Sequence, residues 1–471
     1  MNNVYLCIDL KTFYASVECV ERGLDPFKTK LVVADPSRGN GAITLAISPK
    51  MKELGIHNRC RVFEIPKGID YITAKPRMAL YIKYSADIYE IYLRYVSKED
   101  IHVYSIDEAF LDVTKYLKLY KMTSFELANK IMNDILKEIG ITATCGIGTN
   151  LYLAKIALDI SAKHNKSNIA YLDEETYKKT LWNHRPLTDF WRIGRGISKR
   201  LANIGIYDME GISKASDDTL KKIFGVDYVI LKDHANGIEP VKISDIKKYK
   251  SKDHSISQGQ ILFEDYNYND AKLVVKEMVE VLSLELIDKH LVTDSVGLMV
   301  GYSKDAADAT GGVRKIMQTT NVYSILVENV LKLFDETTNK FVSIRRINLS
   351  FNNVKDELYE QLDLFTDPEV ISKEKNLERT INDLKKRFGK NSILRGMNLE
   401  EKATTRKRNL LIGGHNSGEE EWICWQSKDI CTIWRTKRVQ GSVERKRKNC
   451  CWEKNNFTGR KRKNREYFKR N

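Results

Sequence analysis

A chain of 471 residues is longer than one compact core requires, so several domains are expected, and its 42% apolar content is enough to bury real cores. No apolar run is long enough for a helix that spans a membrane, so we expect no membrane-spanning helix. The formal net charge of +15 favours a polyanionic partner, with nucleic acid as the first candidate.

The first predicted elements alternate between strand and helix. Residues 4–8 are apolar and Asp9 follows at once, so we predict a short buried strand with a carboxylate at its end. Phe13, Val17 and Val20 fall at helical spacing and predict a helix. Further strands are predicted over 31–35 and 43–47, followed by a helix over 50–56 that stops at Gly55.

A long helix is predicted next, from Pro76 to Tyr95. Residues 101–113 then contain two β-rich runs that flank Asp107 and Glu108, which predicts a hairpin with the acidic pair at its turn. An amphipathic helix over 125–139, a strand over 141–147 and a helix over 151–161 follow. Together these elements predict an α/β layer over about the first 165 residues.

The rest of the chain divides by composition. Short helices are predicted over 183–237, and the basic, polar residues 247–252 have the character of a linker. Strand-like and helix-like runs alternate over 255–350, which predicts a second α/β module. An acidic-apolar stretch over 357–365, a helix over 369–388 and a polar segment to about residue 418 come last.

Neither the N-terminus nor the cysteines indicate export. The first residues lack the order of basic, apolar and small residues that marks a signal peptide. Cys7, Cys19, Cys60 and Cys145 show no paired spacing and have the character of small buried apolar residues. We therefore expect a cytoplasmic location.

Three carboxylates stand where a metal site is feasible. Asp9 closes a strand, and Asp107 and Glu108 lie at a hairpin turn, where the backbone fixes a side chain better than a loop does. Two Mg²⁺ ions about 3.5–4 Å apart can hold and neutralise the phosphates in nucleotidyl transfer, and Mg²⁺ prefers such oxygen ligands. Taken singly, the same residues would serve equally as a helix cap and a polar turn.

The residues around these carboxylates carry a more specific pattern. Residues 8–18, 104–112 and 145–157 resemble, in this order and at fitting spacing, the three motifs of the Y-family of translesion DNA polymerases. The resemblance covers about residues 3–415 and is strongest to the UmuC-like branch of bacterial type. It implies an α/β (α+β) multidomain fold, a right hand with palm, fingers, helical thumb and an α/β little-finger domain.

The resemblance also implies domain bounds. The palm would comprise residues 1–10 and 76–165, the fingers 11–75, and a thumb with a helix–hairpin–helix 166–237. A linker over 238–254 would lead to a little finger over 255–353. A C-terminal segment over 354–418 would carry a clamp-binding peptide. The family pattern stops there, and from its composition we expect residues 419–471 to be an atypical, disordered basic tail.

Roles for individual residues follow from the same resemblance. Asp9, Asp107 and Glu108 would be catalytic and would hold two Mg²⁺ ions, with the Leu10 carbonyl as a further metal ligand. Tyr14 would be a steric gate that excludes ribonucleotides, the alternative being an ordinary core aromatic. The remaining nucleotide-binding residues would be Thr12, Phe13, Lys52 and Lys163.

Two positions qualify this assignment. Pro49 stands where some relatives place a tyrosine that contacts phosphate, so part of the triphosphate grip must differ. Gly146 and Gly148 are too closely spaced for a loop that cradles phosphate, and we interpret them as a turn at a strand end.

The predicted thumb has a DNA-binding pattern between residues 191 and 206. Glycines allow the backbone to approach phosphate, helix N-terminal amides bind it, and basic side chains add charge. The residues concerned are Gly194, Arg195, Gly196, Lys199 and Arg200. A plain helical turn with a solvated basic face is the alternative.

Two short segments follow the predicted little finger. Gln361, Leu362, Leu364 and Phe365 resemble the peptide by which bacterial polymerases dock on the sliding clamp, with the start of a surface helix as the alternative. Residues 391–415 resemble a C-terminal signature of the UmuC-like branch, for which the sequence provides no mechanism.

The composition changes past Gly418. Tryptophan, cysteine, arginine and lysine crowd residues 419–471 without apolar periodicity. A zinc site would need a cysteine spacing that is absent, and a disordered basic arm is a second interpretation. We favour a third, in which a shifted reading frame of an A-rich gene encodes the tail.

The predicted function is template-directed DNA synthesis past damaged bases by a low-fidelity polymerase, within DNA repair and the damage response. Its substrates would be primer–template DNA and deoxynucleoside triphosphates, its partner the bacterial sliding clamp, and the polymerase would be monomeric. A nucleotidyl cyclase with a related sheet is disfavoured by the DNA-gripping parts. A non-enzymatic, clamp-binding scaffold is disfavoured because all three carboxylates are present.

Overall fold

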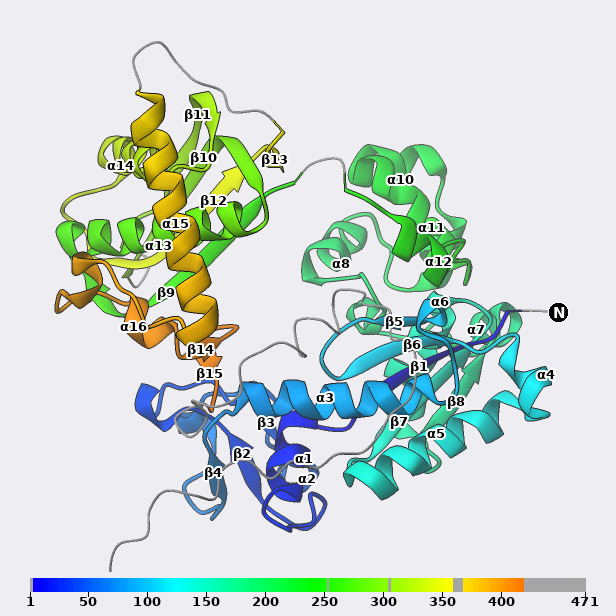
Figure 1. Cartoon of the computed structure of the whole chain (residues 1–471). Helices are drawn as coiled ribbons and strands as arrows, with labels where there is room; N and C mark the ends of the chain where they lie inside the picture. Colours follow the sequence, from blue (N-terminus) through cyan, green and yellow to red (C-terminus); the bar gives the residue numbers. More distant parts are fainter. Residues whose placement is uncertain (1–2, 252–253, 304–305, 359–366, 419–471) are drawn as a thin grey trace, which may run out of the picture.

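The computed structural model describes residues 3–251, 254–303, 306–358 and 367–418. Two α/β modules are separated in sequence by a helical module (Figure 1). The predicted clamp peptide at 361–365 and the tail at 419–471 lie outside the described residues. Within the described ranges, no helix is both long and apolar enough to cross a membrane.

The first module is built on a five-stranded sheet of order β5-β6-β1-β7-β8. Its strands are β1 (Tyr5–Leu10), β5 (Ile101–Val103), β6 (Glu108–Asp112), β7 (Ala143–Gly148) and β8 (Ile169–Leu172). Because side chains alternate along a strand, Leu6 and Ile8 face the core under helices α3 (Met78–Leu93) and α5 (Ser124–Ile139). Tyr5, Cys7 and Asp9 therefore point to the opposite face.

That opposite face is covered by α6 (Leu151–Ile156), which continues through a π-helical turn, η4 (Ala157–Ser161). A Cβ atom at Gly146 would lie 2.1 Å from the Ala154 carbonyl oxygen, and one at Gly148 would lie 2.2 Å from the Ala154 nitrogen. Gly146 lies inside β7 and Gly148 is its last residue, so our interpretation as a strand-end turn is wrong for Gly146, while Gly148 does stand at the strand end. They are glycines because the helix backbone rests directly on the strand.

A smaller sheet of order β3-β2-β4 adjoins the first. Its strands are β2 (Leu31–Val33), β3 (Ala46–Ile47) and β4 (Ile72–Ala74), with helices α1 (Phe13–Val20) and α2 (Pro49–Glu53) alongside. The strand predicted over 43–47 is shorter than expected, because Ile43 forms a lone bridge to Arg61 instead of joining β2.

The helical module contains the helices from α7 to α12. Their bounds are α7 (Glu174–Leu181), α8 (Arg195–Ala202), α9 (Met209–Lys214), α10 (Asp217–Phe224), α11 (Tyr228–Ala235) and α12 (Ile243–Lys248). Two predicted bounds require correction. Strand β8 pairs with β7 and so belongs to the first sheet, beyond the predicted limit at residue 165. Helix α12 lies within the predicted linker, because Ile243 is buried against Tyr5 and Phe110.

The second α/β module is an antiparallel sheet of order β11-β10-β12-β9, as the alternation over 255–350 predicts. Its strands are β9 (Ile256–Tyr266), β10 (Leu291–Tyr302), β11 (Thr310–Thr320) and β12 (Ile344–Asn352), and the short β13 (Lys355–Asp356) pairs with β10. Helices α13 (Tyr268–Asp288) and α14 (Tyr323–Thr337) bury one face. Helix α15 (Pro368–Phe388) packs against α13.

Short elements complete the described chain. Helix α4 (Tyr116–Tyr120) follows β6, and α16 (Thr405–Arg408) precedes a hairpin of β14 (Leu411–Ile412) and β15 (His415–Asn416). This hairpin lies in the segment that was described from the sequence only as polar, with no predicted strands.

Candidate active site

Strand pairing brings the three predicted carboxylates together. Asp9 lies directly opposite Glu108 in the β1–β6 pair, and the Leu10 amide donates to the Asp107 carbonyl oxygen at 2.9 Å. Directly opposed residues have Cβ atoms about 4.5–5.5 Å apart, so the Asp9 and Glu108 side chains are neighbours. Glu108 is the first residue of β6 rather than part of the turn, which makes it the more rigidly held of the acidic pair.

A row of alternating charges lies over these carboxylates. Lys155 Nζ is 2.6 Å from Glu108 Oε2 and 3.0 Å from Asp159 Oδ2. Lys163 Nζ is 2.8 Å from Asp159 Oδ1 and 3.0 Å from Asp9 Oδ2. Lys155 and Asp159 have no role in the prediction from sequence, although the four-residue spacing of 155, 159 and 163 was a usable signal.

Burial governs the protonation of this row. It raises the pKa of Asp9, against the opposing effect of Lys163, and it raises the pKa of Glu108, against Lys155. The fully buried Cys7 thiol, whose pKa burial also raises, donates to Glu108 Oε1 at 3.3 Å. The two ammonium groups therefore compensate carboxylates that burial would otherwise discharge.

The carboxylates offer oxygen donors of the kind that Mg²⁺ prefers. Among the described residues, no three His, Cys, Asp or Glu side chains converge closely enough to hold a metal ion. The reason is that Glu108 turns to Lys155, Asp9 turns to Lys163, and Asp107 accepts from Ser105 Oγ at 2.6 Å. The type of donor therefore fits a divalent metal, while in this structure an ammonium group lies beside two of the three carboxylates, Asp9 and Glu108.

Tyr14 and Phe13 differ in what they face. Phe13 is only 3% exposed and packs in the core, which leaves its backbone alone to meet a nucleotide. Tyr14 is half-buried and stacks on Tyr81 of α3, with ring centroids 4.5 Å apart. Burial first, and then Asp107, raises the pKa of Tyr14, so its ring lies near the acidic pair. Thr12 precedes α1 in the left-handed conformation, at φ 46°.

Three lysines gather beside Asp9. Lys163 contacts it directly, and Lys52 on α2 is within electrostatic reach of Asp9, Lys163 and Lys11. Lys11 Nζ donates to Asn168 Oδ1 at 2.5 Å. Burial lowers the pKa of both Lys52 and Lys11. This cluster suits the negative charge of a triphosphate, and Lys11 is a member that the sequence analysis missed.

The predicted DNA-binding turn lies at the start of α8. Gly194 is the N-terminal cap residue, and because it has no side chain it leaves the first amides of α8 uncapped. The five predicted residues are all exposed: Gly194, Arg195, Gly196, Lys199 and Arg200. The first amides of a helix lack intrahelical partners and can bind an anion. Arg200 differs, because its guanidinium stacks on Phe224 at 4.6 Å and donates to the Ile223 carbonyl.

A side-chain contact ties this helical module to the acidic loop. Trp191 Nε1 donates to the Tyr104 hydroxyl at 3.1 Å, three residues before Asp107. The Tyr104 amide in turn donates to the Glu108 carbonyl oxygen at 2.9 Å. The loop that carries the acidic pair is therefore held by the helical module through Trp191 and by β6 through the Glu108 carbonyl.

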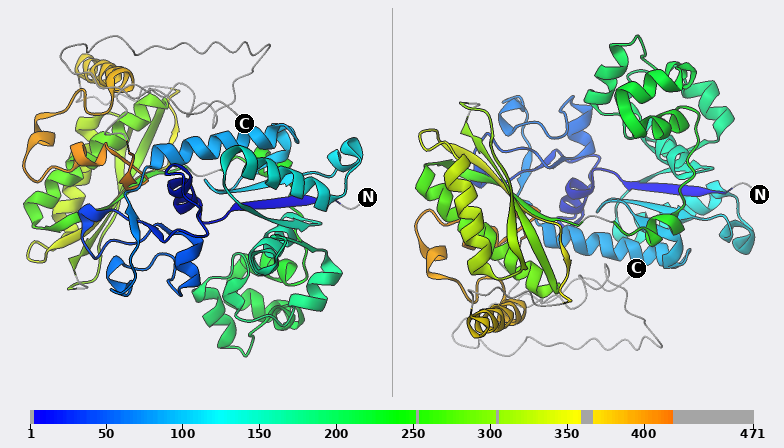
Figure 2. Two further views of the ribbon diagram at one scale, coloured as in Figure 1. Left: turned by 90° about the horizontal axis from the view of Figure 1, so that it is seen from below. Right: turned by 90° about the horizontal axis from the view of Figure 1, so that it is seen from above.

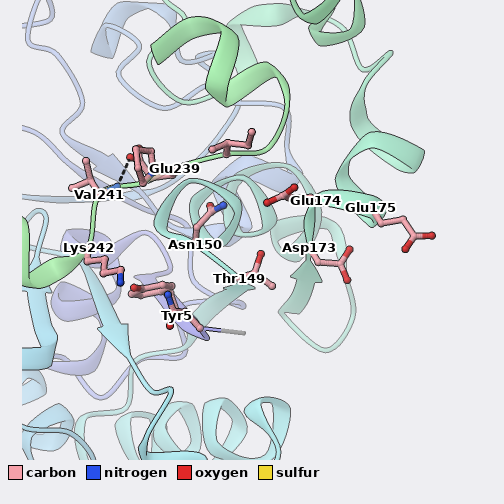
Figure 3. A pocket seen from close by; sticks show the side chains of 12 residues that line it. Tyr5, Thr149, Asn150, Asp173, Glu174, Glu175, Glu239, Val241 and Lys242 are labelled. Atoms are coloured by element: carbon pink, nitrogen blue, oxygen red, sulfur yellow. Dashed lines mark hydrogen bonds between the residues drawn. The ribbon is translucent and has the colours of Figure 1, made fainter. Parts of the chain in front are cut away.

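A cavity of about 610 Å³ lies elsewhere, between Tyr5 of β1, residues 149–150 after β7, the start of α7 and residues 238–242. Figure 3 shows that Asp173, Glu174 and Glu239 project around it. None of the three catalytic candidates lines it. Its acidic lining is unsuited to phosphate, so this cavity is not the nucleotide site.

Known proteins that are similar to this chain indicate its family. The impB/mucB/samB family matches residues 8–159, and its C-terminal domain matches residues 253–364. UvrX of Bacillus subtilis (strain 168) is 32% identical over 418 residues, covering 88% of this chain and 97% of UvrX. The protein named DNA polymerase IV 2 of the same organism is 32% identical over 420 residues, covering 88% of this chain and 98% of that protein.

The fold has a counterpart among solved structures. The Y-family DNA polymerase chimera Dbh-Dpo4(243-245)-Dbh aligns with a TM-score of 0.56 at 22% identity, covering 75% of this chain and 99% of the chimera. The five-stranded sheet corresponds to a palm, and the second α/β module to a little finger. The chain therefore belongs to the impB/mucB/samB family and is a DNA-directed DNA polymerase of the Y-family, translesion type.

Proposed function

We propose that this polymerase extends a DNA primer on a template strand, including opposite damaged bases, with Asp9, Asp107 and Glu108 as its catalytic carboxylates. The observation that carries the proposal is the pairing of β1 with β6, which places these acids side by side next to a lysine cluster. Acids beside phosphate-binding cations are what nucleotidyl transfer requires.

The three carboxylates and the Leu10 carbonyl would hold two Mg²⁺ ions. When bound, Mg²⁺ neutralises charge on the phosphates and on the attacking and leaving oxygens. The chain's own residues do the rest. Lys163, Lys52 and Lys11 bind the triphosphate, and Tyr14 closes the space beside the sugar.

DNA would be held by parts remote from the carboxylates. The exposed amides and basic side chains at the start of α8, in the proposed thumb, would bind backbone phosphate without reading sequence. The second α/β module would grip the same duplex. Residues 11–75, which carry Tyr14 and Lys52, would act as fingers. We further propose a monomeric polymerase in the cytoplasm.

Primer extension tests the proposed function directly. With Mg²⁺ and all four deoxynucleotides, the protein should extend a primer past an abasic site in the template. Extension that stops one nucleotide before the site, on a template whose undamaged form is fully copied, would contradict translesion activity. The undamaged template is the matched control.

The sliding clamp is a further proposed partner, on sequence grounds, through Gln361, Leu364 and Phe365. Changing the three together to alanine should leave distributive synthesis on a short primer unchanged and remove stimulation by a bacterial clamp. Buried apolar anchors dominate small interfaces, so a micromolar contact, about −8 kcal/mol, should become undetectable by calorimetry.

Asp363→Ala is the control, because a charge at the rim contributes little. Unchanged clamp affinity in the triple variant would place the docking site elsewhere. Activity lost in the absence of clamp would show that the segment supports the fold instead.

A further inference from the structure

Residues 391–418 include the C-terminal signature for which the sequence provides no mechanism. Their first half is anchored on the second α/β module through Glu277 of α13, a side chain that is only 2% exposed. Glu277 accepts from the Thr404 amide at 2.7 Å, the Thr404 hydroxyl at 2.9 Å and the Thr405 amide at 3.2 Å. Asn398 Nδ2 donates to the same carboxylate at 3.2 Å. A buried carboxylate supplied with this many donors is a specific anchor.

Strand β9 of the second module contributes to the same anchor. Gln260 Nε2 donates to the Thr404 hydroxyl at 2.8 Å, and the Tyr266 hydroxyl donates to the Lys402 carbonyl at 3.1 Å. We call residues 402–418 the C-terminal strap. Its first part is thus held to α13 and β9 together.

The strap then turns back in the β14–β15 hairpin. Gly413 and Gly414 both have positive φ, 58° and 81°, which a two-residue hairpin turn of this hand requires. The Gly414 carbonyl accepts from Arg38 Nη2 at 2.6 Å. Ile412 packs against the core of the first module. The Gly-Gly pair of the signature is therefore explained by a turn whose tip contacts the first module.

The end of the strap lies on the start of α3. The Ser417 carbonyl accepts from the Ala79 amide at 3.0 Å. Gly418 has φ 82°, and a Cβ atom there would come within 2.9 Å of Arg77. Arg77 in turn binds the fully buried Glu18 of α1, at 2.8 Å between Nη2 and Oε2. Helix α1 also carries Tyr14, so the strap ends beside the helix of the proposed gate.

Other packing between the two parts is slight. Among the described residues, the extensive contacts of β9–β13 and α13–α15 are with one another or with the residues that lead into the strap, not with the first or the helical module. Figure 1 places α16, β14 and β15 between the second sheet and the start of α3, and the left view of Figure 2 shows the orange C-terminal segment running from the second module toward α3.

We propose that the C-terminal strap is a positioning element that fixes the second α/β module against α3 and residues 36–38, so that both parts grip one primer–template. The DNA half of this inference rests on the proposed function. When two modules bind the same ligand, a connection that limits their relative motion raises the overall affinity for that ligand, because the second module then binds at a high effective concentration. Glu277 acts through the strap and touches no reacting atom.

Glu277→Gln tests the anchor. An amide nitrogen cannot accept, so half of the donors to this position lose their partner. Hydrogen exchange of the Ala79 amide is the readout, because the second residue of a helix has no intrahelical acceptor and its protection reports the strap alone. We expect Ala79, Thr404 and Thr405 to exchange faster, and primer–template affinity to weaken about tenfold with kcat unchanged at saturating DNA.

Glu264→Gln is the matched control, since Glu264 pairs with Lys402 of the same strap at 2.7 Å but on the exposed surface. It should change neither exchange nor affinity. Arg38→Gln is the second variant, in the first module where it contacts the hairpin tip at Gly414, and outside the buried anchor. It should release the Ala79 amide and weaken DNA binding while Thr404 and Thr405 stay protected, which also excludes a folding defect of the second module.

Rapid exchange at Ala79 in the unmodified protein would overturn the proposal. So would faster exchange in both variants with unchanged DNA affinity, because the strap would then dock without positioning anything. Absence of primer extension by the unmodified protein would overturn only the proposed function. The exchange rate of the Ala79 amide is measured without DNA, so it would still report whether the strap is docked on α3.

Discussion

Asp107→Asn and Glu108→Gln should each abolish nucleotide addition, by on the order of a thousandfold or more in kcat, while primer–template binding is retained. Each substitution removes a charged oxygen ligand and leaves the volume of the side chain. DNA binding should persist because the proposed DNA contacts lie at α8 and on the second α/β module.

The amide variants are preferable to alanine because of the contacts at Glu108. Lys155 Nζ lies 2.6 Å from its carboxylate, and both side chains are less than one-tenth exposed. Deleting one partner of a buried ion pair typically costs about 3–5 kcal/mol. Both substitutions remove the negative charge, but the amide oxygen of Gln can still accept a hydrogen bond from Lys155, whereas Ala leaves no acceptor there and loses more stability. Asp107 has no such partner among the ion pairs of the described residues, which makes Asp107→Asn the cleaner of the two.

Asp112→Asn is the matched control, on the same strand and the same face of the sheet but remote from Asp9. It should retain near-normal extension. Single-turnover primer extension and fluorescence anisotropy of labelled primer–template measure the two quantities separately. Extension at more than a few per cent of the unmodified rate in either variant would refute the metal assignment.

The second large effect is expected at Tyr14. Tyr14→Ala should raise the efficiency of ribonucleotide incorporation relative to deoxynucleotide incorporation about a hundredfold, because removing the ring removes the clash with a 2′-hydroxyl. The measured quantity is the ratio of kcat/KM for a ribonucleotide to that for the matching deoxynucleotide.

Tyr14→Phe serves as the control, since it keeps the ring and its stacking on Tyr81. Its discrimination should equal that of the unmodified protein. If Tyr14→Ala lowers both efficiencies equally, the ring at this position is packing only. The thermal unfolding midpoint of each variant shows whether an equal fall in both efficiencies comes from lost packing in a folded protein or from loss of the fold.

Several elements were predictable because local pattern and tertiary role agree. The apolar run before Asp9, the periodicity of α5 and the helix at Pro368–Phe388 all lie close to the residues predicted for them. The carboxylates were found through motif resemblance, and strand pairing then supplied the reason that Asp9 meets Glu108.

Other features depend on which segments meet in space. From the sequence alone, Gly146 and Gly148 suggest a turn. The structure shows instead that the absence of a side chain at both positions lets the backbone of α6 at Ala154 pack directly against β7. This packing places Lys155 and Lys163 over the acids. Strand β8 and helix α12 crossed the predicted bounds for the same reason, since pairing and burial partners are not encoded within the segment itself.

The sequence by itself thus determined the family and most regular elements, and it predicts the three acids as the catalytic residues, because motif order and apolar period are local properties of the chain. Tertiary structure alone decided what compensates the acids and where the C-terminal signature is anchored. Glu277 and Thr404 are far apart in sequence, and neither has a pattern that indicates the other. A buried carboxylate must find its donors, and only the folded chain shows that they come from the strap.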